Sequence, residues 1–243
     1  MKKLVLAAAT LPFIGHAAFA QQIDLGGLGQ ADGTTVGYII QMFGLLTILS
    51  VAPGILIMVT SFTRFVIALS ILRSGMGLQS TPANLILISL SLFMTFYVMA
   101  PTFDQAWSTG VKPLMNNEIT QGVAVERIST PFRDFMVRNV REKDFDLFAD
   151  LARERGQTVS EDKVDLRILV PAFMISEIRR GFEIGFLIVL PFLVIDLIVA
   201  TITMAMGMMM LPPTVVSLPF KILFFVLIDG WNLLVGSLVR SFS

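Results

Sequence analysis

A run of methionines stands between two long apolar segments of the sequence. Met208, Met209 and Met210 are consecutive, and they separate residues 186–206 from residues 215–235. Thioether side chains are flexible and polarizable, so they fill irregular gaps, and they also bind soft metal ions such as Cu(I). The cluster therefore suits either a flexible apolar seal or a copper site.

The residues that flank these methionines do not allow a continuous helix. Gly207 precedes them and Pro212-Pro213 follows them, and glycine and proline both interrupt helices. Backbone that leaves helical pairing at membrane depth is stable only where it is buried in protein or faces a water-filled cavity. We therefore predict that residues 207–213 form a loop that lines a pore.

Three ionisable residues, Asp196, Lys221 and Asp229, stand in the same apolar runs. Each is unfavourable in lipid unless it has a partner or water. Because Asp196 and Lys221 lie on either side of a short loop, we predict that they pair, across the hairpin or between subunits. Two facing carboxylates can also share a proton and activate water, which leaves an intramembrane aspartyl protease that uses Asp196 and Asp229 as an alternative.

Most enzyme chemistry is excluded by composition. The chain has no cysteine, and its one histidine, His16, lies in a segment that we expect to be removed. Thiol chemistry, disulfides, Cys/His zinc sites and histidine acid/base catalysis are therefore absent. Acidic and basic residues are equal in number, so nothing favours nucleic acid as a partner. We predict a protein that is not an enzyme and has no cofactor or metal.

The apolar content predicts an all-α membrane protein. Of the 243 residues 55% are hydrophobic, the mean hydropathy is +0.79, and apolar runs reach about 20 residues, the length of a membrane span. We expect about four spans arranged as kinked helical hairpins. Residues 38–101 form the first pair and residues 181–243 the second, with the methionine loop in the second.

The beginning of the chain reads as a signal peptide. Residues 1–20 have a basic start, an apolar centre and an Ala-Phe-Ala ending, which is typical of a cleaved secretory signal. Residues 21–37 are rich in glycine and predict a flexible lead. Arg64 and Arg73 lack acidic neighbours, which favours the cytoplasm for the connection that carries them. The polar residues 102–180 and both mature termini are then predicted to lie outside.

Helix boundaries in the first pair are predicted from prolines. We expect a span over 38–60 that is kinked at Pro53, followed by a helix over 62–73. Thr81-Pro82 predicts the start of the next span, and Pro101 predicts its end.

The polar segment, residues 102–180, carries most of the charges and predicts a small helical domain. Thr130-Pro131 predicts a helix start, and a second amphipathic helix is separated from the first near residues 141–144. Apolar faces of such short helices need a partner to be buried well. The segment is therefore either a solvated helical domain or a contact between subunits through Phe135, Phe145 and Phe148.

Four long motifs resemble the FliP family, the flagellar counterpart of the R subunit of type III secretion systems. They are SFTRFVIALSILRSGMG at 61–77, PAFMISEIRRGFEIGF at 171–186, LPFLVIDLIVATITMAMGMMMLPP at 190–213 and LPFKILFFVLIDGWNLLVGSL at 218–238. The resemblance covers nearly all of the chain after the signal peptide.

This resemblance implies a subunit of the flagellar protein export gate. Several copies, typically five, would assemble with FliQ and FliR into a helical oligomeric cone in the inner membrane and flagellar basal body, with FlhB associated and much of the complex toward the periplasm. Unfolded flagellar proteins would pass through it. The family's methionine gasket corresponds to Met208, Met209 and Met210. The contact between copies corresponds to a set on the polar segment and the start of the third span: Phe135, Phe148, Arg138, Arg141 and Glu177.

Two other functions stay open on the residues alone. The methionine cluster is compatible with a small-ion or Cu(I) transporter, although clustered methionines are more often packing residues than ligands. The aspartyl protease is the weaker of the two, because acids on separate spans are also expected as helix-pairing residues.

Overall fold

The computed structural model describes residues 33–156, 164–207 and 212–242. In these ranges every regular element is a helix, which confirms the predicted all-α class. The chain divides into two compact units, Met1–Ser50 and Val51–Ser243. The predicted signal peptide, most of the predicted lead, and Met208, Met209 and Met210 lie outside the described residues.

The first helix crosses the boundary between the units. Helix α1 (Gly33–Met58) contains Pro53 and is followed, after a short break, by α2 (Phe62–Gly75). This break lies where the sequence predicted it. One side of α2 is almost entirely buried, so the helix acts as a central element against which other helices of the second unit pack.

The third helix continues beyond its predicted end. Helix α3 (Asn84–Ala106) contains Pro101 and passes without interruption into the π-helical turn η2 (Trp107–Val111) and α4 (Lys112–Met115). The predicted end at Pro101 is wrong, and so is the predicted start at Thr81-Pro82, because the helix begins at Asn84. A proline inside a helix costs about 3 kcal/mol, and buried side chains on both sides of Pro101, Met99 and Thr102, offset that cost.

The polar segment folds into two helices, α5 (Gln121–Asn139) and α6 (Glu142–Glu154). The predicted helix start at Thr130-Pro131 is wrong, since α5 runs through Pro131. That proline is itself buried, so packing outweighs its missing hydrogen bond. The separation between α5 and α6 lies close to the predicted one.

The longest helix is α7 (Leu166–Ala205), with 40 residues and with Pro171 and Pro191 inside it. At about 1.5 Å per residue it is roughly 60 Å long, about twice the hydrocarbon thickness of a bilayer. The predicted fourth span over 215–235 is wrong as a single helix. It is divided into α8 (Pro213–Leu227) and α9 (Gly230–Arg240), which are bent by 65°.

The bend between α8 and α9 has a local cause. Asp229 has a φ of 52°, a left-handed conformation that ends the preceding helical run. A Cβ on Gly230 would lie 2.3 Å from the Phe225 ring. A larger residue at position 230 would therefore collide with the end of α8.

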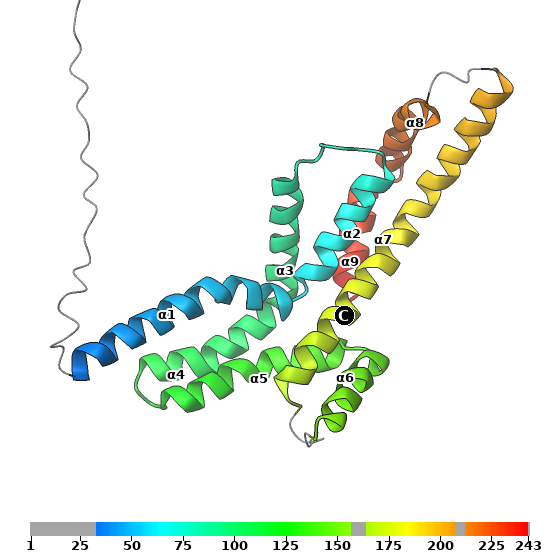
Figure 1. Cartoon of the computed structure of the whole chain (residues 1–243). Helices are drawn as coiled ribbons and strands as arrows, with labels where there is room; N and C mark the ends of the chain where they lie inside the picture. The colour runs from blue at the N-terminus through cyan, green and yellow to red at the C-terminus, as the bar shows by residue number, and fades with distance from the viewer. Residues whose placement is uncertain (1–32, 157–163, 208–211, 243) are drawn as a thin grey trace, which may run out of the picture. The chain divides into compact units, whose positions relative to one another are not determined.

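Two apolar cores lie along α7, and Figure 1 shows α2 beside its middle part and α5 and α6 near its N-terminal end. The first core joins α2, α3, α7, α8 and α9 around Phe65, Leu69 and Phe192. The second joins α3, α5 and α7 around Phe135 and Phe173. Of the two buried ion pairs described below, one lies where the two cores meet. The other lies at the end of the first core that is more distant from the second.

Among the described residues, three helical stretches are long and apolar enough to cross a membrane, or four if the bent pair of α8 and α9 counts as one. The stretches are Gly37–Met58, Asn84–Met115 and Leu166–Ala205. This number agrees with the prediction of about four apolar spans.

Candidate functional site

The close approach of α2 to α7 depends on glycine. A Cβ on Gly185 would lie 2.8 Å from Ile71, and one on Gly75 would lie 2.3 Å from Val189. Small residues at such positions let helix backbones come together in apolar surroundings. Gly181 and Gly185 form a G-x-x-x-G spacing on α7. Both approach isoleucines of α2.

The C-terminal end of α2 is joined to the α7–α8 hairpin by a buried lysine. The ammonium of Lys221, on α8, donates to Asp196 Oδ2 at 2.5 Å and to the Gly75 carbonyl at 3.1 Å. The Ser217 hydroxyl donates to the other oxygen of Asp196 at 2.5 Å. A cation near the last carbonyls of a helix is also favoured by the helix dipole. Lys221 therefore connects three helices.

The structure places the three ionisable residues that were predicted in the apolar runs. Asp196 and Lys221 meet across the hairpin within one chain. Asp229 is exposed at the bend between α8 and α9. Since both oxygens of Asp196 accept hydrogen bonds from α8, its carboxylate is engaged in packing, an arrangement unlike the proton-sharing pair of an aspartyl protease.

The ends of the methionine loop are fixed by local backbone chemistry. Gly207 has a φ of 72° and its N–H donates to the Met204 carbonyl, a glycine-terminated helix end. Pro213 is the first residue of α8, a position that tolerates its missing N–H. The hairpin thus leaves α7 at Ala205 and re-enters a helix at Pro213.

A second buried ion pair joins α2 to the middle of α7. Arg64 and Glu177 both have fully buried side chains. The guanidinium donates from Nε at 2.9 Å and from Nη2 at 2.5 Å to the two oxygens of Glu177. Its Nη1 donates to the carbonyl and the hydroxyl of Ser241 at 2.9 and 2.8 Å. Planar bidentate pairing of this kind is specific to arginine.

The residue after Ser241 completes this cluster. The Phe242 ring lies 3.5 Å from Arg64 Cζ, a cation–π contact. Its ring also contacts Phe65 of the first core and Phe135 of the second. Arg64 and Phe242 therefore connect the two cores. Because Arg64 is buried and paired with Glu177, its charge does not indicate a side of the membrane, and the cytoplasmic position of this connection stays a prediction.

The residues predicted to contact other subunits lie in different surroundings. Phe135 and Glu177 are buried within the chain. Phe148 is half-buried and packs on the small core between α6 and α7. Arg138 is exposed and Arg141 is half-buried. Phe135 and Glu177 are thus packed inside the chain. Phe148, Arg138 and Arg141 have exposed surface that can contact another subunit.

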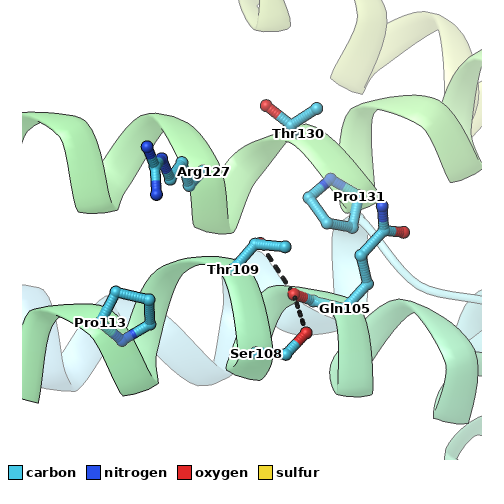
Figure 2. Close-up of a pocket in the computed structure, with 7 residues that line it drawn as sticks. All are labelled: Gln105, Ser108, Thr109, Pro113, Arg127, Thr130 and Pro131. Carbon is cyan, nitrogen blue, oxygen red and sulfur yellow. Dashed lines mark hydrogen bonds between the residues drawn. The ribbon is translucent and has the colours of Figure 1, made fainter.

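Figure 2 shows a cavity of about 370 Å³ beside η2 and α5. The hydroxyls of Ser108 and Thr109 both donate to the Gln105 carbonyl, at 3.1 and 2.8 Å. These groups are therefore satisfied by their own helix. Arg127 is the one charged residue among those that line the cavity. No convergent polar group distinguishes it as a ligand site.

Neither the Arg64–Glu177 pair nor the glycine interface was predicted from the sequence. The G-x-x-x-G spacing of Gly181 and Gly185 was a signal that could have indicated the interface. The ion pair had no local signal, because its two residues are 113 positions apart. The one indication of this ion pair in the sequence is that both residues are charged and stand in otherwise apolar motifs.

The fold and these clusters define an all-helical protein with membrane-span-length helices, in which buried charges join helices to one another. Comparison with known proteins identifies its relatives. Residues 45–238 match the model of the FliP family, and the chain belongs to this family.

Three relatives, each named flagellar biosynthetic protein FliP, illustrate the similarity. The protein from Rhizobium meliloti (strain 1021) is 76% identical over 212 residues, which cover 87% of this chain and 86% of the relative. That from Agrobacterium fabrum is 75% identical over 215 residues and 88% of each chain. That from Bacillus subtilis is 48% identical over 212 residues, 87% of this chain and 96% of the relative. These names describe flagellar biosynthesis and no catalytic activity.

Proposed function

We propose that this chain is a core subunit of the flagellar type III protein export gate. Several copies, typically five, assemble with FliQ and FliR into a channel for unfolded flagellar proteins, and FlhB associates with the assembly. Membership of the FliP family supports this proposal. The structural observation that carries it is the interruption between α7 and α8, the two apolar helices on either side of the methionine loop.

The seal is assigned to Met208, Met209 and Met210. A loop of flexible thioethers can close on itself and on a passing polypeptide, because methionine adapts its shape to its surroundings. An apolar constriction also resists water and ions by dewetting. Gly207, Pro212 and Pro213 set the ends of this loop. The Asp196–Lys221–Ser217 cluster joins α7 to α8 at the base of this loop.

The assembly is proposed to lie in the bacterial inner membrane, within the basal body, with much of it toward the periplasm. The length of α7, roughly 60 Å, exceeds what a bilayer core of about 30 Å needs. Part of α7 must then extend beyond the hydrocarbon region. Its N-terminal half, which packs with α5 and α6, is the more polar one and suits that position.

The seal is tested by replacing Met208, Met209 and Met210 together with alanine. The expected results are a membrane that leaks ions and altered secretion of filament protein in cells that carry only this variant. Leakage is measured as the rate of membrane depolarisation, and secretion as filament protein in the medium.

A matched control is Met115→Ala, at an exposed methionine at the end of α4. It should leave both readouts unchanged. If the triple variant also leaves leakage and secretion unchanged while its protein level is normal, the proposed seal is wrong.

A further inference from the structure

A cavity of about 490 Å³ lies where α3, α5, α7 and the residues after α9 meet. Arg138 of α5 and Arg180 of α7 both line it, together with Asn139. Its remaining wall includes the apolar residues Phe135 and Phe242. The cavity therefore combines two arginines with a wall of mixed polar and apolar residues.

Neither of the two arginines forms an ion pair with a described residue. The Nε of Arg138 donates only to the Asp134 carbonyl, on its own helix. The Arg180 guanidinium is half-buried and makes no hydrogen bond or ion pair with a described residue. The carboxylate of Glu177, whose charge interacts with Arg180, is already bound to Arg64 on both oxygens. Arginine forks favour bidentate binding of carboxylates or phosphates, so the cavity is suited to an acidic group from outside the chain.

An acidic stripe of matching character lies on α6. Glu142, Asp146 and Asp150 are exposed and spaced four residues apart, so they share one face of the helix. Asp150 pairs with Arg153 at 2.7 Å, whereas neither Glu142 nor Asp146 forms a hydrogen bond or ion pair with the side chain of any described residue. The stripe thus offers two available carboxylates one helical turn apart.

Within one chain the stripe and the cavity do not meet. Helix α6 is held against α7 by Ala149 and Ala152 and by the Ser176 hydroxyl, which donates to Asp144 at 2.7 Å. In Figure 1, α6 lies on one side of α7 and α3 lies on the other. Each chain therefore presents an acidic surface and a basic cavity in different places.

We infer that the cavity of one copy receives the acidic stripe of α6 from the next copy. Arg138 and Arg180 bind Glu142 and Asp146 of that copy, and the half-buried position of Arg180 makes its pair the less screened one. Two different surfaces that bind each other give a head-to-tail interface, which closes into a ring when the rotation permits. This inference rests on the proposed multi-copy assembly and identifies the contact that forms it.

The absence of native cysteine permits a direct test by thiol-specific cross-linking. The variant Arg138→Cys/Asp146→Cys is produced as the full chain, together with the other gate components, and its membranes are treated with a short bis-maleimide. This reagent spans the gap between the two sites, because an arginine–carboxylate pair holds its Cα atoms farther apart than a disulfide can bridge. A head-to-tail contact links each copy to two others, so gel electrophoresis should show dimers, trimers and larger species that are absent without the reagent.

Two controls define the position of the contact. Each single-cysteine variant should stay monomeric on the gel. The variant Arg138→Cys/Leu151→Cys should give at most about one tenth of the cross-linked product, since Leu151 lies on the opposite edge of the exposed face of α6. Equal product from both pairs, or dimers without larger species, would overturn the inference.

Charge reversal provides a second measurement that needs no cross-link. Arg138→Glu/Arg180→Glu should lower the amount of detergent-extracted multi-copy complex about tenfold. Adding Glu142→Arg/Asp146→Arg to the same chain restores the opposite charges at every contact and should recover the complex to within about threefold. Lack of recovery would show that these residues are not partners.

Other outcomes separate this contact from its alternatives. If the double reversal leaves the complex intact and instead lowers the phosphatidylglycerol retained by the purified protein, the cavity is a lipid headgroup site and the inference is wrong. A complex of normal mass without any ladder of cross-linked species refutes the contact and leaves the export-gate proposal standing. Failure of the unmodified chain to form any multi-copy complex would refute the assembly itself.

Discussion

Two buried ion pairs lie on α7, roughly five helical turns apart. They differ in how far their side chains are exposed and in how many hydrogen bonds the cation makes. The Arg64–Glu177 pair has no exposed side-chain surface, and its guanidinium has four hydrogen bonds and an aromatic contact. In the Lys221–Asp196 pair, the carboxylate side chain is 26% exposed. The ammonium is a point donor that binds Asp196 and one carbonyl.

This difference indicates two uses of charge in an apolar bundle. A fully buried pair contributes little net stability, but loss of one partner leaves an unpaired charge in a low-dielectric interior. Substitution of either member of the Arg64 pair should therefore strongly destabilise the junction between the two cores. In the Lys221 pair, part of the Asp196 carboxylate lies at the surface of the chain. This pair can therefore be strained or opened at a lower cost in free energy than the fully buried pair.

The largest expected effect is that of Glu177→Leu. This change leaves the Arg64 guanidinium buried with only the Ser241 acceptors, and we expect a loss of about 3–5 kcal/mol in folding stability. The variant should be degraded in cells, or should unfold in detergent at a much lower temperature than the unmodified chain. Thermal unfolding of the purified protein and its steady-state level in cells measure the effect.

A matched control is Glu183→Leu on the same helix, since Glu183 pairs with Arg179 at an exposed site. Exposed pairs contribute at most about 1 kcal/mol. Comparable losses from the two variants would mean that burial of the Arg64 pair does not determine its importance.

The same contrast explains what the sequence could predict. The Lys221–Asp196 pair was predictable because the two residues flank a short turn, which limits where each can find a partner. The Arg64–Glu177 pair was not, since its partners come from opposite halves of the chain and Arg64 alone resembles an ordinary basic residue at a helix end. Long-range pairs of this kind are set by helix packing, which a single sequence does not display.

Helix boundaries show a similar limit. The break before Phe62, the end of α7 at Ala205 and the start of α8 at Pro213 follow local rules, and the sequence predicted all three closely. Pro101 and Pro131 were read as boundaries by the same rules, yet α3 and α5 continue through them. A cost of about 3 kcal/mol for an internal proline is outweighed where the turns on both sides are packed.

A double-mutant cycle on Lys221 and Asp196 sharpens the comparison. Lys221→Met and Asp196→Leu should each cost about 2 kcal/mol, less than Glu177→Leu, because this site is partly open to water. The double variant should be more stable than the sum of the two losses predicts, by about 1–2 kcal/mol, since neither charge remains unpaired. Thermal unfolding in detergent provides the values.

The reference for this cycle is Lys221→Met combined with Glu183→Leu, two sites without a shared partner, for which the losses should add. If the Lys221 and Asp196 losses are also purely additive, the two charges do not interact and the proposed ion-paired base of the loop has no support.

The smallest effects concern the serine that assists each pair. Ser241→Ala removes one of two acceptors of Arg64 Nη1 in a fully buried site, and we expect a loss of about 1–2 kcal/mol. Ser217→Ala removes a donor to Asp196, whose exposed surface lets water replace it, so the loss should be under about 1 kcal/mol. Unfolding temperatures of the two variants, measured side by side, test this order. A larger loss at Ser217 would show that the hairpin cluster is as closed to water as the Arg64 cluster, and the distinction between a rigid junction and an adjustable base would fail.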